Sequence, residues 1–138
     1  MDVCVLIGRL LFAVLLLPAG FHHLTKGTTL VEFVRAKGLP LPATSVYASG
    51  VCLLAGGLSV LLGVWADLGS LLLAVFLVAA AVTMHNFWTV QQPQAKQNDR
   101  SHFNKNIELA GASLMLFAFF AHTPDLGLTL TGPLFSLS

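Results

Sequence analysis

The chain has 138 residues, of which 56% are hydrophobic and only 9% are charged. A water-soluble domain carries roughly a quarter charged residues, so this composition excludes a protein that is surrounded by water and points to a lipid bilayer. The net charge of +1 gives no reason to expect a nucleic-acid partner. The length predicts one domain, a single membrane domain over residues 1–138.

Four apolar runs predict four membrane-spanning helices, over residues 3–24, 44–65, 68–88 and 104–121. About 20 helical residues cross the hydrocarbon core of a bilayer, and each run is close to that length. The first run is interpreted as a retained helix and not as a signal peptide. It is preceded by acidic Asp2, whereas a signal peptide has a basic region at this position. The predicted fold is therefore all-α, a bundle of four transmembrane helices.

Two residues of the first span are unusual for a helix in lipid. Pro18 lacks a backbone donor and clashes with the preceding turn, so it predicts a kink between residues 14 and 18. Arg9 places a charge inside the span, which is unfavourable unless the side chain reaches the surface or finds a partner. Two interpretations of this intramembrane charge stay open, a snorkelling arginine near the helix end and a functional arginine.

The segment between the first two spans predicts a short helix that lies in the plane of the lipid head groups. Thr29 and Glu32 have the spacing of a capping box, and apolar and basic residues fall on different sides of the helix. Gly38 suits the C-terminal cap. Pro40 and Pro42 then end this helix before the second span starts.

Glycines of the second span recur seven residues apart, Gly50 with Gly57 and Gly56 with Gly63. Small residues at this spacing let helices approach closely in lipid, so we expect these glycines to serve packing. The next connection is expected to consist of Ala66-Asp67, which makes the second and third spans a tight antiparallel pair. The segment over residues 89–103 is the most hydrophilic one and is expected to be a loop.

Basic residues outside the spans fall in or beside the first and third connections: Lys26, Arg35, Lys37, Lys96, Arg100 and Lys105. Connections rich in lysine and arginine stay in the cytoplasm, so both termini are predicted to be extracytoplasmic. The expected location is the bacterial inner (plasma) membrane, with the lipid bilayer as the main partner.

This topology brings the candidate ligand-binding residues together at the cytoplasmic end. They are His22, His23, His85, Asn86, Trp88, Lys105, Asn106 and Glu108. Glu108 lies about one turn inside the apolar run, where a carboxylate needs a partner or a bound proton. Lys105 on the same helix face, or one of the three histidines, is the expected partner.

Three interpretations of these polar residues are open. The first is an interfacial ring that anchors the helix ends and satisfies its own hydrogen bonds. The second is a small-molecule site, for instance for a quinone head group, where histidine and glutamate bind carbonyls and exchange protons. The third is a metal or haem site, but no HxxxH or HxxE spacing occurs, so no metal ligands are assigned.

Short motifs of the chain occur in an order and spacing that are similar to those of a known family. They are Gly8-Arg9-Leu10, Gly20, Gly38-Leu39-Pro40, Gly56-Gly57-Leu58, Gly63, His85 to Trp88, Lys105-Asn106, Gly111, Gly132-Pro133 and Ser136-Leu137. In these motifs the chain resembles the DoxX family of small four-helix integral membrane proteins. It departs from the family at Leu53, where members often carry glutamate, and at His22 or His23, where many carry lysine. It also ends in Ser-Leu-Ser in place of Ser-Leu-Asp.

The resemblance implies a redox-associated membrane subunit, because some relatives are subunits of thiosulfate:quinone oxidoreductase and others are partners of redox enzymes. A quinone is then the expected ligand, and a redox-enzyme subunit or a second copy of the chain is the expected partner. If the chain takes part in catalysis, it does so as a subunit of a membrane oxidoreductase. The alternative is a non-catalytic scaffold or assembly factor, which holds a partner against its helix faces.

Overall fold

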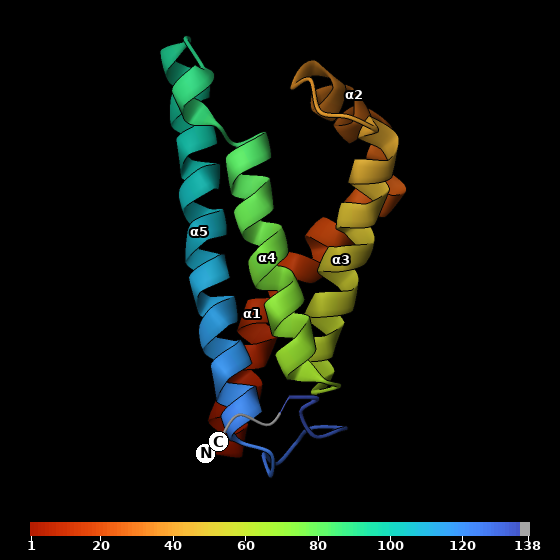
Figure 1. The fold of residues 1–138 in the computed structure, drawn as a ribbon, viewed down its shortest axis with the longest axis vertical. Helices are drawn as coiled ribbons and strands as arrows, with labels where there is room; N and C mark the ends of the chain where they lie inside the picture. Colours follow the sequence, from red (N-terminus) through yellow and green to blue (C-terminus); the bar gives the residue numbers. More distant parts are fainter. Residues whose placement is uncertain (136–138) are drawn as a thin grey trace.

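The computed structural model describes residues 1–135, and all regular secondary structure in this range is helical. The closing motif at residues 136–138 lies outside the described residues. The helices are α1 (Asp2–Thr25), α2 (Gly27–Ala36), α3 (Pro42–Leu62), α4 (Ala66–Met84), the short 3₁₀ helix η1 (Phe87–Thr89) and α5 (Pro93–His122). Helices α3, α4 and α5 run along the long axis of the bundle and α1 slants behind them, with α2 at one end and the N-terminus at the other (Figure 1).

Among residues 1–135, three helical segments are long and apolar enough to cross a membrane, Asp2–Thr25, Pro42–Leu62 and Ala66–Thr89. The all-α class and the membrane character are therefore confirmed, and these segments lie close to the first three predicted spans. The predicted connection at Ala66-Asp67 is wrong, because both residues belong to the first turn of α4. The chain turns instead at residues 63–65, where Gly63 and Trp65 have φ angles of 67° and 44°.

The predicted loop at residues 89–103 is also wrong, since α5 begins at Pro93 and continues for 30 residues. Proline is well tolerated in the first turn of a helix, where its missing donor has no partner to lose. Inward-facing positions recur at helical spacing from the polar part into the apolar part: Ala95, Asp99, His102, Phe103, Asn106, Ala110 and Ser113. Because most residues of the segment are polar, the apolar period of 3.6 residues that predicts a helix could not be recognised there.

The N-terminus of α2 differs from the prediction. The helix begins at Gly27, with Lys26 in the capping position and no side-chain hydrogen bond at the cap. Thr29 therefore lies inside the first turn, and the expected capping box with Glu32 is wrong. Glu32 instead pairs with Arg35, three residues later on the same exposed face.

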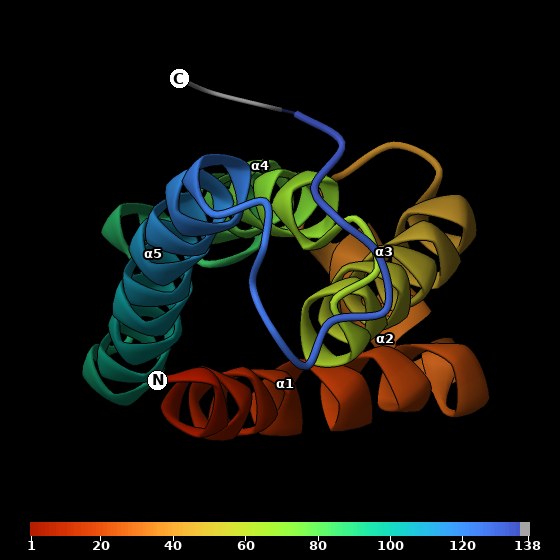
Figure 2. The same ribbon diagram turned by 90° about the horizontal axis from the view of Figure 1, so that it is seen from below.

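Glycines of α3 form two rows, and each row faces a different neighbour. Gly50 lies against Gly20 of α1, where an added Cβ would approach the Gly20 carbonyl oxygen to 3.1 Å. Gly57 faces α1 as well, whereas Gly56 is covered by the side chain of Leu73 from α4. The predicted packing role of these three glycines is thus confirmed, and α3 is the helix that lies between α1 and α4 (Figure 2).

Arg9 of α1 is only 1% exposed, although it carries a charge. Its guanidinium donates to the carbonyl oxygens of Val60 at 2.8 Å, Leu61 at 2.6 Å and Leu128 at 2.7 Å. Val60 and Leu61 are in the last turn of α3, where carbonyls have no partner within the helix. The snorkelling interpretation is therefore wrong: Arg9 caps α3, and the negative end of that helix dipole favours its positive charge.

The segment after α5, residues 123–135, crosses the same end of the bundle and is called the strap below (Figure 2). The Leu130 amide donates to the Leu62 carbonyl at 3.2 Å, next to the residues that Arg9 caps. The Phe135 amide donates to the fully buried Asp67 carboxylate at 2.6 Å. The strap thus connects the end of α3 with the start of α4.

Candidate functional site

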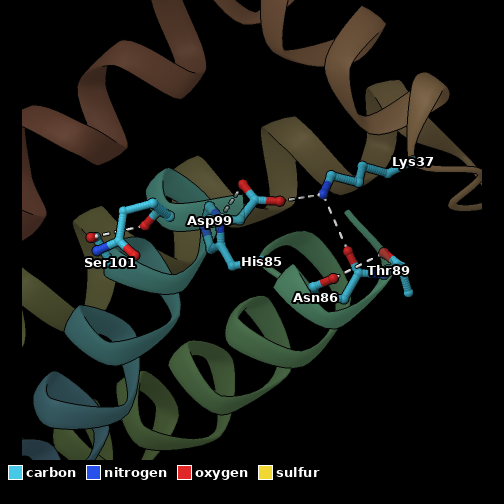
Figure 3. Close-up of polar contacts among 7 residues, drawn as sticks. Lys37, His85, Asn86, Thr89, Asp99 and Ser101 are labelled. Carbon is cyan, nitrogen blue, oxygen red and sulfur yellow. Dashed lines mark hydrogen bonds and ion pairs between the residues drawn. The ribbon is translucent and has the colours of Figure 1, made fainter. Parts of the chain in front are cut away.

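A group of polar side chains lies at the α2 end of the bundle and is called the Lys37 cluster here. Its members are Lys37, His85, Asn86, Asp99 and His102. The Lys37 Nζ donates to Asp99 Oδ2 at 2.8 Å and to Asn86 Oδ1 at 3.2 Å (Figure 3). One lysine from the end of α2 therefore contacts both the turn that follows α4 and the first turns of α5.

The turn that ends α2 places Lys37 at this position. Gly38 has a φ of 73°, and its amide donates to the Arg35 carbonyl at 2.9 Å. The Leu39 amide donates back to the Val34 carbonyl at 3.4 Å. This pair of bonds is a Schellman motif, which confirms the predicted role of Gly38 as the C-terminal cap. Lys37 is the last residue before that glycine, so the motif fixes where its side chain starts.

His85 lies near both an acid and a second imidazole. Its Nδ1 atom is 3.8 Å from Asp99 Oδ1, which is too long for a hydrogen bond. The Nδ1 atom is also buried and has no hydrogen-bond partner among residues 1–135. The ring also stacks on His102, with 5.0 Å between the centroids. His85 is thus the one ring of the cluster that combines a nearby carboxylate with an unsatisfied nitrogen.

The cluster is shielded from water, because the side chains of Lys37 and Asp99 are only 16% and 13% exposed and that of His85 is 20% exposed. Charges attract more strongly where water is excluded, so the pair is held more firmly than one on an open surface. The positive charge of Lys37 compensates the negative charge of Asp99. The cluster can therefore offer the donors of Lys37 and Asn86, and the His85 ring, to a polar group without a large net charge.

Three aromatic rings lie beside the cluster. The centroids of Phe87 and Trp88 are 5.3 Å apart, those of Phe87 and Phe103 are 5.4 Å apart, and those of Trp88 and Phe103 are 5.8 Å apart. All three pairs meet edge to face, an arrangement that the ring quadrupoles favour. His85 and Asn86 are thus followed directly by Phe87 and Trp88, which form an aromatic wall together with Phe103.

The comparison with protein families gives one match. The model of the DoxX family matches residues 4–86, which is more than half of the chain. The chain belongs to the DoxX family. No curated protein and no solved structure matched it. The DoxX match runs from α1 to Asn86, so it includes Lys37 and His85 of the cluster and ends before α5.

Membership of the DoxX family and the three apolar helices together identify an integral membrane protein. Of the candidate residues, the structure places His85 and Asn86 in the Lys37 cluster and Trp88 in the adjoining aromatic wall.

The two histidines of α1 lie elsewhere. His23 shares a hydrogen bond of 2.6 Å with Ser49 of α3, so it links α1 to α3 and does not contact His85. His22, at the preceding position of the helix, is exposed. Adjacent helical residues point about 100° apart, and this rotation separates the two rings. Their part in ligand binding stays a prediction.

The three candidates on α5 also separate. Asn106 is buried on the inward face, one turn beyond His102, whereas Lys105 and Glu108 are exposed. Within residues 1–135, Glu108 makes no ion pair and no side-chain hydrogen bond, so the expected pairing with Lys105 or a histidine is not present there. The part of Glu108 in ligand binding stays a prediction.

Three residues of the cluster were missed from the sequence: Lys37, Asp99 and His102. Asp99, His102 and Asn106 follow one another at spacings of three and four, which places them on one helix face. That signal was present but lay in a segment interpreted as a loop. Lys37 had no comparable signal, because its partners are 49 and 62 residues away. Among residues 1–135, no group of three His, Cys, Asp or Glu side chains is arranged to hold a metal ion.

Proposed function

We propose that this DoxX protein is the membrane subunit of a redox system and that its Lys37 cluster binds the head group of a quinone. The observation that carries the proposal is the buried, unpartnered Nδ1 atom of His85. A buried polar atom without a partner costs about 1–3 kcal/mol, so a ligand that hydrogen-bonds there is favoured. A quinone offers carbonyl oxygens, which can accept a hydrogen bond from a protonated Nδ1 atom. Its reduced form offers hydroxyl groups, which can donate a hydrogen bond to an unprotonated Nδ1 atom.

Each part of the cluster then has a task. Lys37 and Asn86 donate hydrogen bonds to a quinone carbonyl, and His85 donates or accepts a proton as the redox state changes. Reduction of the quinone takes up two electrons and two protons, and oxidation of the quinol releases them. A partner redox enzyme supplies or removes the electrons. The rings of Phe87 and Trp88 provide an aromatic edge for the flat head group.

The proposal includes the membrane arrangement. α5 has 30 residues and is therefore about 45 Å long, longer than the ~30 Å hydrocarbon core. We propose that its apolar part, residues 104–121, is the fourth span and that its first turns project from the bilayer. The amphipathic α2 then lies in the head-group plane. Residues 1–138 form a single membrane domain in this arrangement.

The orientation follows from the charges. Lys26, Arg35, Lys96, Arg100 and Lys105 are all exposed at or near the α2 end. Excess basic residues mark the cytoplasmic side, so the cluster lies at the cytoplasmic surface of a bacterial inner membrane, with both termini outside. A quinone dissolved in the bilayer reaches this depth with its head group at the surface and its tail in the hydrocarbon.

The chain offers an internal reporter for this proposal, because Trp88 and Trp65 are its two tryptophans and lie at opposite ends of the bundle. In a Trp65→Phe variant, Trp88 is the single tryptophan and is excited selectively. Titration of the variant in nanodiscs with a short-chain ubiquinone is expected to quench Trp88 in a saturable manner. Adding His85→Leu should abolish saturation.

The matched control is Trp88→Phe, which leaves Trp65 as the reporter. There, quenching should rise without saturation as quinone dissolves in the lipid. Equal, non-saturable quenching of Trp88 with and without His85→Leu would contradict a quinone site at the cluster.

A second function, a scaffold for a membrane complex, is favoured by one observation on α1. This helix buries a single narrow row: Arg9, Ala13, Leu16 and Gly20. Large apolar side chains on its other sides, such as Ile7 and Leu11, are exposed and can meet a partner helix or a second copy of the chain. A partner that stays bound after His85→Leu but leaves after Leu11→Ala would support the scaffold and not the quinone site.

A further inference from the structure

The helices pack in two groups. The first group is α1, α2 and α3, which contact one another, and the second is α4, η1 and α5. The pairing of α3 with α4 joins the groups, and it is close near their hairpin, where Leu73 covers Gly56. Towards the other end the axes of α3 and α4 spread apart, so the groups are closest at the hairpin end (Figure 1).

The hairpin end is held by several bonds. Arg9 of the first group donates to the Leu128 carbonyl of the strap, which directly follows α5. The Leu130 amide of the strap returns to the Leu62 carbonyl of α3. Because the strap bonds to α1, to α3 and to Asp67 of α4, this end of the two groups cannot separate without loss of several buried hydrogen bonds.

The α2 end is held differently. Across residues 1–135, the side-chain hydrogen bonds that join the two groups at this end are both made by Lys37, to Asp99 and to Asn86. Rotation about the flexible stem of Lys37 breaks both bonds and leaves the helix that carries it intact. The side chain of one lysine therefore makes the hydrogen bonds that close this end, whereas backbone bonds and a buried arginine close the other.

We propose that the pair Lys37–Asp99 is a latch. When it opens, the two helix groups swing apart about the end that Arg9 and the strap hold together. The movement uncovers His85 and Asn86 and admits a molecule from the cytoplasmic leaflet. Release and closure of the latch then control access to the cluster. The motion does not depend on the ligand being a quinone, so it can be tested without any ligand.

Distances between spin labels measure this motion directly. Cys4→Ser and Cys52→Ala remove the native cysteines, and labels at Thr28→Cys and Gln97→Cys mark the exposed surfaces of α2 and α5. In nanodiscs, the wild-type latch should give a narrow distance distribution. Lys37→Met and Asp99→Asn should each shift it to longer distances or broaden it. The exchange Lys37→Glu with Asp99→Lys should restore the narrow distribution, because the pair forms again with its charges reversed.

Two controls separate the latch from general damage. Lys96→Met removes an exposed lysine from the same part of α5 and should leave the distribution unchanged. A label pair at Val3→Cys and Asp125→Cys should keep its distance in every latch variant, which shows that the hairpin end stays folded. If Lys37→Met fails to fold, Lys37→Ala, which also lacks a donor, replaces it and is judged by the same criteria.

The proposal is overturned if folded Lys37 and Asp99 variants keep the wild-type distribution, because packing then holds the groups together. It is equally overturned if the single variants open the bundle but the charge exchange does not close it.

Discussion

The guanidinium of Arg9 donates to the carbonyl oxygen of Val60 at 2.8 Å, across 51 positions of the sequence. Two further carbonyls, of Leu61 and Leu128, complete its hydrogen bonds. A charge inside an apolar helix is thus used to join the first span to the end of the second and to the strap. The bundle consequently has a firmly bonded end, opposite the end that carries the Lys37 cluster.

Replacing Arg9 with Met removes these three bonds and leaves buried carbonyls without donors. Hydrogen bonds to charged groups contribute about 1.5–3 kcal/mol each, so a loss of about 3 kcal/mol or more is expected. Thermal unfolding in mild detergent measures it. Arg9→Lys should recover only part of the loss, because an ammonium group lacks the planar fork that reaches three acceptors. An Arg9→Met protein as stable as wild type would show that the strap alone holds this end.

Gly38 offers a test of how Lys37 is positioned. Its φ of 73° is unfavourable for alanine, although an added Cβ would meet nothing within 4 Å. Gly38→Ala should therefore destabilise by about 1 kcal/mol through backbone strain alone. The matched control is Gly111→Ala, which is also free of contacts but lies within α5. It should be neutral or stabilising by about 0.5–1 kcal/mol in an unfolding titration. Equal effects of the two variants would contradict the strained turn.

Variants of Glu108 test whether its carboxylate contacts other residues of the chain or binds a molecule from outside it. It is exposed and has no ion-pair partner within residues 1–135, so Glu108→Gln and Glu108→Leu should both unfold at the wild-type temperature. If Glu108 binds a partner or ligand from outside the chain, both variants should lose that molecule during purification. Loss of stability in Glu108→Leu would instead reveal an internal contact of the carboxylate.

The proposed orientation is tested by cysteine labelling in intact cells. Cysteines placed at Lys96 and at Asp125, in a background without Cys4 and Cys52, report on opposite ends of the bundle. A membrane-impermeant maleimide should label the position at 125 and spare the position at 96 until the cells are opened. The reverse pattern would place the Lys37 cluster on the outer surface.

The parts of the fold that could be predicted are those in which one kind of residue continues or recurs at a regular spacing along the chain. Apolar runs predicted the positions of α1, α3 and α4, and the glycine spacing predicted the close packing of Gly50 and Gly57 on α1. The first turns of α5 were missed because their polarity resembles that of a loop. The inward positions Asp99 and His102 nevertheless follow the helical period of the apolar part.

The contacts that close the site and the opposite end could not be predicted, because each joins residues that are distant in the sequence. A lysine at the end of an amphipathic helix predicts a solvated charge, and only the folded chain shows that Lys37 reaches Asp99 of α5. Likewise, an arginine in an apolar helix has many possible acceptors. The end of α3 and the strap have to be in place before Val60 and Leu128 can be recognised as its acceptors.

The claim that the Lys37 cluster holds a quinone is tested most directly by measuring the quinone that stays with the purified protein. Wild-type protein, His85→Leu and a control are extracted in the same mild detergent, and the bound quinone is quantified by mass spectrometry. The control is His122→Leu, which removes an exposed histidine at the far end of α5. Wild type and His122→Leu should retain equal, stoichiometric amounts of quinone, and His85→Leu should retain only a trace. A wild-type protein without quinone, or a His85→Leu protein that retains as much as wild type, would contradict the proposed function.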